Sequence, residues 1–136
     1  MIPKIIHYCW FGNGEKSPVI NKCMKSWKKK CHDFKIIEWN ETNFDVNMNS
    51  FCKEAYLEKK WAFVSDYARL WILYNYGGIY LDTDIEVLKR LNPLLENRAF
   101  IGFESDDFLQ SGIIGCEKNN YMIKVLMDRY EIKTFY

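Results

Sequence analysis

Residues 62–84 constrain the fold more than any other part of the chain. From Ala62 to Asn75 apolar side chains surround the helical circumference, which predicts a buried helix rather than a surface one. Gly77-Gly78 ends that helix, and Ile79-Tyr80-Leu81 is short and apolar enough to be a core strand. The strand runs directly into Asp82-Thr83-Asp84. This order predicts an α/β fold with polar side chains at the carboxyl end of a buried strand.

The flanking sequence predicts further strands and helices around this unit. Lys4–Trp10 is a short apolar strand, and it is followed by a glycine loop and by a helix that Ser17 caps and Pro18 opens. Phe34–Trp39 is the next strand, so the opening is a β-α-β unit with parallel strands. The remaining predicted elements are a helix at Ser50–Lys59, strands at Ile85–Leu88, Ala99–Phe103 and Gly112–Cys116, and a last helix capped by Asn120.

Composition limits the class of protein. The 136 residues are 49% hydrophobic and 17% aromatic, enough to bury one core, so we expect a single domain over 1–136. The formal net charge of +1 gives no overall field that would hold nucleic acid. No apolar run approaches the roughly 20 residues that span a bilayer, and the start of the chain has no secretory signal pattern. We expect a cytoplasmic protein without a transmembrane segment. Peripheral association with the inner face of the membrane is compatible with this expectation.

The cysteines and histidines do not form a familiar metal pattern. Five cysteines are an odd number and include no C-x-x-C pair, which favours reduced thiols in the core. A zinc site from Cys23, Cys31 and His32 is the alternative. His7 is available as a base, but it lies within a strand pattern, and a hydrogen-bonded core histidine is the preferred interpretation.

The acidic pair Asp82 and Asp84 is the strongest candidate for a functional site. Two aspartates two residues apart at the end of a strand project to the same side, with Cα atoms about 6–7 Å apart. Carboxylate oxygens suit Mn²⁺ or Mg²⁺, and these ions keep positions that phosphate oxygens can fill. The pair therefore predicts a diphosphate-binding metal site, and Gly77-Gly78 would let a ligand approach the backbone. The alternative is that Asp-x-Asp marks only a turn.

Asp66 and Arg69 add two charges to the otherwise apolar helix. They lie three residues apart, so a helical salt bridge worth about 0.2–0.5 kcal/mol would explain them. Charges in so apolar a helix are costly to bury unless they bind each other or a ligand. We therefore expect them to converge with the acidic pair at one end of the sheet.

Two blocks of sequence carry a family resemblance. The stretch from Trp61 to Arg69, together with Gly77-Gly78-Ile79-Tyr80-Leu81-Asp82-Thr83-Asp84 and the opening Ile2 to Gly12, resembles the sugar-binding-region glycosyltransferases that contain a DXD motif. That family includes bacterial capsular-polysaccharide transferases and yeast initiating mannosyltransferases and, more distantly, the catalytic domains of clostridial glucosylating toxins. The resemblance covers residues 2 to about 116.

The resemblance implies a GT-A-like (Rossmann-like) mixed sheet flanked by helices, a nucleotide-sugar donor and transfer with retention at the anomeric carbon. Trp10 would stack on the base of the donor, Asp66 would bind hydroxyl groups of the donor sugar, and Arg69 would contact the sugar or the diphosphate. Tyr80 matches an aromatic residue that lines the donor pocket, and Ser111 would add a polar contact.

The resemblance also assigns the metal. Asp84 would ligate Mn²⁺ or Mg²⁺ directly, and Asp82 would touch the ribose or sugar and bridge to the metal through water. The metal and Arg69 would stabilise the charge that grows on the leaving diphosphate. No nucleophile is assigned, because a front-face mechanism needs none. Members of the family usually continue past residue 136, so we expect a C-terminally truncated fold that binds its donor weakly.

These observations predict a retaining, metal-dependent hexosyltransferase of surface or capsular polysaccharide synthesis. The expected donors are UDP-galactose or UDP-glucose, and the expected acceptor is a saccharide or a lipid-linked saccharide. Three alternative functions compete with this one. A non-catalytic remnant that binds a nucleotide-sugar or a partner protein remains open. An Asp-x-Asp phosphatase is less favoured because its motif normally opens the domain. A glycosidase is also disfavoured, because its two carboxylates must flank the scissile bond, whereas Asp82 and Asp84 face the same way.

Overall fold

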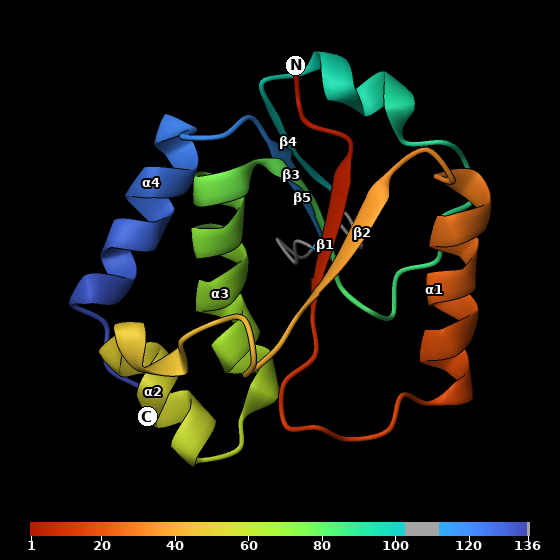
Figure 1. The fold of residues 1–136 in the computed structure, drawn as a ribbon. Coiled ribbons are helices and arrows are strands. Elements are labelled where there is room, and N and C mark those ends of the chain that lie inside the picture. Colours follow the sequence, from red (N-terminus) through yellow and green to blue (C-terminus); the bar gives the residue numbers. More distant parts are fainter. Residues whose placement is uncertain (103–111, 136) are drawn as a thin grey trace.

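The computed structural model describes residues 1–102 and 112–135, and within them the chain forms one mixed five-stranded sheet (Figure 1). The order in the sheet is β2-β1-β3-β5-β4, with β1 parallel to both β2 and β3. β5 is antiparallel to β3 and β4. The strands are β1 (Ile5–Cys9), β2 (Lys35–Trp39), β3 (Gly78–Leu81), β4 (Ala99–Gly102) and β5 (Ile113–Cys116).

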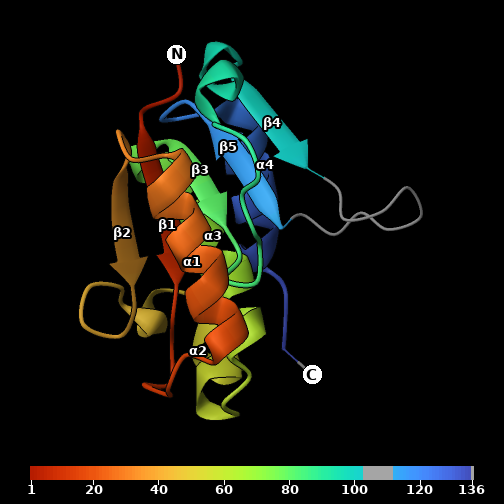
Figure 2. The ribbon, with the colours of Figure 1, turned by 90° about the vertical axis from the view of Figure 1, so that its right-hand side faces the viewer.

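Helices cover both faces of this sheet and make three layers (Figures 1 and 2). Helix α1 (Pro18–Lys30) lies on one face, and α2 (Ser50–Leu57), α3 (Trp61–Tyr76) and α4 (Tyr121–Asp128) lie on the other. Short 3-10 turns occupy Val46–Met48, Asn92–Glu96 and Arg129–Glu131. The α/β fold class, with a mixed sheet flanked by helices, is confirmed.

The opening β-α-β unit forms as its sequence predicts. Ser17 caps α1, since its hydroxyl accepts a hydrogen bond from the Ile20 amide at 3.3 Å, and Pro18 takes the first helical position. Cys23 and Trp27, one turn apart, bury the inner side of α1. The chain then returns to β2, which pairs with β1 in parallel register.

The two faces of the sheet carry separate halves of the core. On the α1 face, Ile6, Tyr8 and Ile79 pack with Trp27, whose side chain is fully buried. On the other face, Cys9 and Tyr80 pack beneath α3. Alternate residues of β1 and β3 thus point to opposite helical layers, which is the pattern of a strand buried on both faces.

The prediction of a strand at Ile85–Leu88 is wrong. This segment has β-forming residues, but it pairs with no strand in the described part of the chain, and it packs along α1 instead. The indole Nε1 of Trp27 donates to the Ile85 carbonyl at 2.7 Å, and the Val87 amide donates to the Ser26 hydroxyl at 2.8 Å. Side chains of α1 thereby satisfy the backbone groups that a neighbouring strand would otherwise pair.

Gly77 and Gly78 pack against the protein itself, which corrects the expectation that they would let a ligand approach the backbone. They lie at the amino end of β3, opposite to Asp82, with φ of 68° and 119°. A Cβ at Gly78 would stand 2.8 Å from the Ile5 carbonyl oxygen, and one at Gly77 would stand 2.7 Å from the Lys118 nitrogen. The two glycines therefore allow close packing of the protein's own backbone.

His7 is a core histidine, as preferred from the sequence. Its Nδ1 accepts a hydrogen bond from the Trp39 indole at 3.0 Å, so the proton is on Nε2, which donates to the Gly77 carbonyl at 2.8 Å. Burial, opposed in part by this bond to Gly77, lowers the pKa of His7 to about 4. The ring is therefore neutral at physiological pH.

The cysteines are free thiols, and all five are buried, as predicted. His32 is exposed whereas Cys23 and Cys31 are buried, and the zinc alternative is not supported. Within residues 1–102 and 112–135, no three His, Cys, Asp or Glu side chains come together in a way that could hold a metal ion. In the same residues no helix combines the length and the apolar character needed to cross a membrane.

Candidate active site

A cleft of about 460 Å³ opens at the carboxyl ends of β1 and β3. Its walls come from the loop after β1, from the first half of α3 and from the turn after β3. Six of the seven residues that the sequence nominated line this one cleft: Trp10, Asp66, Arg69, Tyr80, Asp82 and Asp84. Ser111, the seventh, lies outside the described residues. The structure thus brings together side chains that are up to 74 residues apart in the chain, from Trp10 to Asp84.

A turn, rather than the strand itself, holds the acidic pair. The Asp82 amide donates to the Gly112 carbonyl at 2.9 Å and so continues the pairing of β3 with β5. The Ile85 amide then donates to the Asp82 carbonyl at 3.1 Å, which closes a turn through Thr83 and Asp84. Asp82 is half-buried and Asp84 is exposed, and both line the cleft. The expected convergence is present, although the strand geometry from which it was predicted ends at Leu81.

The charges around Asp82 favour a cation beside it. Burial raises the pKa of Asp82 to about 6, and the neighbouring Asp84 and Asp66 carboxylates act in the same direction. Arg69 and a hydrogen bond with Tyr80 act in the opposite direction. A carboxylate that is poorly solvated and close to other carboxylates gains stability when a positive ion approaches.

Asp66 and Arg69 form the expected pair on α3. The Arg69 Nη2 lies 3.7 Å from the Asp66 Oδ1, and the Arg69 side chain is only 20% exposed. Burial raises the pKa of Asp66, and the Arg69 guanidinium opposes that shift. Because both side chains also line the cleft beside Asp82, the pair is more than a surface salt bridge. It places one cation and one more carboxylate next to the acidic turn.

Tyr80 forms the floor of the cleft and is only 2% exposed. It points to the α3 face of the sheet, where it packs in the same core as Cys9. Burial raises the pKa of its hydroxyl well above the ordinary value. The Tyr80 hydroxyl is therefore neutral, and its hydrogen bond with Asp82 acts to lower the pKa of that carboxyl.

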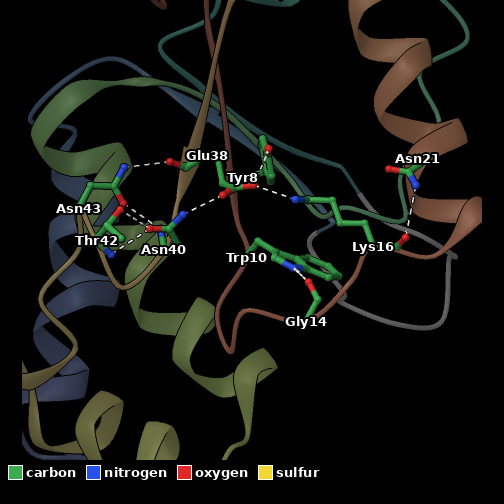
Figure 3. Close-up of polar contacts among 9 residues, drawn as sticks. All are labelled: Tyr8, Trp10, Gly14, Lys16, Asn21, Glu38, Asn40, Thr42 and Asn43. Atoms are coloured by element: carbon green, nitrogen blue, oxygen red, sulfur yellow. Dashed lines mark hydrogen bonds and ion pairs between the residues drawn. The ribbon is translucent and has the colours of Figure 1, made fainter.

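Trp10 stands at the rim of the cleft and is half-buried. Its amide donates to the Trp39 carbonyl at 2.8 Å, and its indole Nε1 donates to the Gly14 carbonyl at 2.8 Å. The Nζ of Lys16 lies 5.2 Å from the centre of the Trp10 ring and 2.9 Å from the Glu38 Oε1 (Figure 3). The loop after β1 is thus folded back over Trp10 and fixes its orientation.

Sequence reasoning missed the residues that shape this loop. Gly12 has a φ of 88°, and a Cβ there would stand 2.4 Å from the Trp61 side chain, which also lines the cleft. The Gly12 amide donates to the Glu41 Oε2 at 2.7 Å, and the Tyr56 hydroxyl donates to the same oxygen at 3.0 Å. The glycines of the loop were visible in the sequence, but no local signal connected them with Glu41.

Comparison with known families identifies the motif. Residues 17–101 match the family model described as a glycosyltransferase sugar-binding region containing a DXD motif, and this match includes Asp66, Arg69, Asp82 and Asp84. The chain belongs to this glycosyltransferase family. The resemblance drawn from the sequence is confirmed, and the phosphatase alternative loses its basis.

Curated relatives of this chain include two yeast enzymes whose names contain the word mannosyl. Inositol phosphoceramide mannosyltransferase 1 of Schizosaccharomyces pombe is 32% identical over 110 residues, which cover 74% of this chain and 33% of that protein. Mannosyl phosphorylinositol ceramide synthase SUR1 of Saccharomyces cerevisiae is 30% identical over 144 residues, which cover 93% of this chain and 34% of that protein. The chain spans about a third of the length of these relatives.

A solved structure supports the fold. The structure titled PaToxG Glycosyltransferase matches with a TM-score of 0.71 at 21% identity, over 93% of this chain and 58% of that one. The mixed sheet and its flanking helices are therefore a glycosyltransferase fold. The relatives named above are an inositol phosphoceramide mannosyltransferase and a mannosyl phosphorylinositol ceramide synthase, and they give no support to the predicted role in capsular polysaccharide synthesis.

Proposed function

We propose that this chain is the donor-binding part of a retaining, metal-dependent glycosyltransferase that moves a hexose from a nucleoside diphosphate sugar. The observation that carries the proposal is the convergence of Asp66, Arg69, Asp82 and Asp84 on one cleft at the carboxyl ends of two parallel strands. That position is where α/β sheets bind their ligands. The two carboxylates of the acidic turn and the Arg69 guanidinium suit a ligand that brings a metal ion together with phosphate oxygens, which would complete the coordination of that ion.

The acidic turn would hold Mn²⁺ or Mg²⁺. Asp84 is exposed to solvent and would ligate the ion directly, and Asp82 would bind it through water or contact the ribose. When bound, the ion acts as a Lewis acid for the departing diphosphate. The carboxylate oxygens fit a hard cation, and the raised pKa of Asp82 is consistent with a group that gains from one.

The other side chains would orient the donor. The Arg69 guanidinium is held beside Asp66 and would contact the phosphate or sugar, where it stabilises charge that develops in the transition state. The remaining oxygen of Asp66 would accept hydrogen bonds from hydroxyl groups of the sugar. Trp10 at the rim would stack on the base. Retention by front-face attack needs no nucleophile from the protein, and we assign none.

Mannose is the first sugar to test. The names of the relatives in both yeasts specify mannosyl transfer to an inositol phosphoceramide, which is a lipid acceptor. UDP-galactose and UDP-glucose, the donors expected from the sequence, are the comparison set. A lipid or lipid-linked saccharide acceptor would bring the cleft to a membrane surface, so we propose that the protein works at the cytoplasmic face of a membrane by peripheral association.

Thermal unfolding with nucleoside diphosphates, with and without Mn²⁺, tests the binding proposal. A diphosphate at 100 times its Kd adds about 2.7 kcal/mol to the free energy of unfolding, and we expect this gain to require Mn²⁺. Asp84→Asn should remove the metal-dependent part. Glu86→Gln is the matched control, because Glu86 is exposed two residues further on and does not line the cleft.

Two outcomes would contradict the proposal. An Asp84→Asn variant that responds to diphosphate and Mn²⁺ like the parent would refute the metal role of the acidic turn. A diphosphate that stabilises the chain equally with and without Mn²⁺ would refute the metal dependence of the site.

A further inference from the structure

Helix α1 carries an unbalanced positive charge. It contains five lysines and no acidic residue, whereas the whole chain has 19 basic and 18 acidic residues. Without these five lysines the rest of the chain has a formal net charge of −4, because 14 basic residues then stand against 18 acidic ones. The small net charge of the protein is therefore the sum of a strongly basic helix and an acidic remainder.

Most of these lysines lie on the outer side of α1. Lys22, Lys25 and Lys29 are spaced i, i+3 and i+7, which places them along one side of a helix, and all three are exposed. Lys28 is exposed beside them, and we call these four lysines the basic face. Trp27 holds the opposite side of the helix against the sheet. In Figure 2, α1 lies in front of the sheet with its outer side towards the viewer.

The basic face has no acidic partner in the described part of the chain. None of its lysines forms an ion pair there, whereas Lys16 lies 2.9 Å from Glu38 and Lys124 pairs with Asp128. Lys25 and Lys29 are four residues apart, a spacing at which like charges on a helix repel each other. An anionic partner would relieve this repulsion.

The dipole of the helix explains only part of this charge. Lys28, Lys29 and Lys30 lie in the last turn, where the dipole favours cations. Lys22 lies in the second turn and Lys25 near the middle of the helix, and the effect of the dipole falls off within the last turn. These two lysines therefore extend the basic face beyond what the end of a helix accounts for.

One end of the basic face adjoins the candidate active site. Ile20, in the first turn of α1, lines the cleft, and Lys22 follows two residues later. A surface held by the lysines of α1 would therefore lie next to the cleft.

Two exposed apolar side chains border the basic face. Val19, in the first turn of α1, is 64% exposed, and Leu88 is 72% exposed. Leu88 directly follows Val87, whose amide donates to the Ser26 hydroxyl of α1. Lysines with apolar neighbours suit a lipid surface, which offers anionic headgroups above acyl chains. The backbone of a nucleic acid offers phosphates but no such apolar layer.

We propose that the basic face of α1 docks on a bilayer that contains anionic lipids and so brings the cleft to its lipid acceptor. The inference rests on the proposed function, in which the acceptor is a lipid or a lipid-linked saccharide. The apolar side of α1 is already packed on the sheet, so the helix binds by charge and does not insert. Each lysine close to an anionic bilayer contributes about fivefold in affinity, and salt weakens this attraction.

Co-sedimentation of the full chain with vesicles tests the proposal. We expect binding to vesicles of mixed phosphatidylserine and phosphatidylcholine, none to phosphatidylcholine alone, and loss of binding between about 0.1 M and 0.5 M salt. Lys25→Gln combined with Lys29→Gln should weaken binding about 25-fold. Lys53→Gln combined with Lys118→Gln is the matched control, because both are exposed lysines outside the basic face, and it should weaken binding less than about threefold.

The possible failures are distinguishable. If the two double variants weakened binding equally, the attraction would come from overall charge, and the basic face would be refuted. If the chain ignored phosphatidylserine but kept its Mn²⁺-dependent stabilisation by a diphosphate, this inference would be overturned and the transferase function would stand. Vesicle binding without any response to diphosphates would have the reverse meaning. Tighter binding to a DNA duplex than to the mixed vesicles at equal salt would identify a nucleic acid as the partner and overturn the proposal.

Discussion

His7 and Asp82 should give the free energy of unfolding two opposite dependences on pH in the same range. The pKa of buried His7 falls to about 4 from an ordinary value of 6.5, so the unfolded chain binds the proton more readily. Its contribution to stability is complete above pH 6.5 and is lost as the pH falls towards 4. Between pH 7 and pH 4.5 that loss amounts to about 2 kcal/mol.

Asp82 acts in the other direction. Its folded pKa is raised to about 6 from 3.8, so the folded state binds the proton more readily. The favourable contribution of Asp82 is fully present below pH 3.8 and is lost as the pH rises through 6. Between pH 7 and pH 4.5, acidification gains at most about 2 kcal/mol from this group, and less because Asp82 is only half-buried.

Urea unfolding at pH 7 and pH 4.5 separates the two contributions when the parent is compared with His7→Gln and Asp82→Asn. Relative to the parent, His7→Gln should gain about 2 kcal/mol on acidification, and Asp82→Asn should lose up to about 2 kcal/mol. Differences from the parent remove the titrations that all three proteins share. If the difference between His7→Gln and the parent is the same at both pH values, the assignment of a neutral, hydrogen-bonded His7 is refuted.

Two further predictions concern the framework of the site. Gly78→Ala should destabilise the fold by about 2–4 kcal/mol in urea, because its Cβ would meet the Ile5 carbonyl at 2.8 Å on a backbone with φ of 119°, whereas Gly14→Ala, with no atom within 4 Å, should change stability by less than about 1 kcal/mol. Equal effects of the two changes would contradict the packing role of Gly78. Ser17→Ala should cost about 1 kcal/mol by thermal unfolding through loss of the cap on α1, and Ser17→Asp should restore it; no loss in Ser17→Ala would show that the hydrogen bond to Ile20 contributes nothing.

Local sequence signals were sufficient to predict the helices whose boundaries are set by capping residues or by their own apolar pattern. Ser17-Pro18 caps α1, Asn120 caps α4, and the apolar circumference of residues 62–75 predicted α3 to within a residue at each end. These features depend on side chains near in sequence. Local signals failed at Ile85–Leu88. The β-branched residues of this segment favour a strand, but they cannot show that its backbone bonds to side chains of Ser26 and Trp27 and not to a neighbouring strand.

The residues of the site could be predicted where they lie together in one short segment. They could not be predicted where segments that are distant in sequence meet. Asp82 and Asp84 could be predicted because they directly follow a buried strand. Glu41 gave no such signal, because its role depends on the end of β2 lying beside the loop after β1, which brings it to Gly12, 29 residues earlier. Gly77 and Gly78 show the converse error. The sequence predicted that this conspicuous motif lets a ligand approach, but the atoms closest to it belong to the protein itself.

Topology explains why this Asp-x-Asp lies in a cleft when many others lie only in turns. After β1 the chain crosses by α1 on one face to β2, and after β2 it crosses by α2 and α3 on the other face to β3, which lies on the opposite side of β1. After β3 the chain continues to β4 and β5, which lie on the side of β3 away from β1. The connections that follow β1 and β3 therefore leave the boundary between these strands in opposite directions and open a crevice at their carboxyl ends. Trp10 directly follows β1 and Asp82 directly follows β3, so the order of strands in the sheet places the aromatic rim opposite the acidic turn.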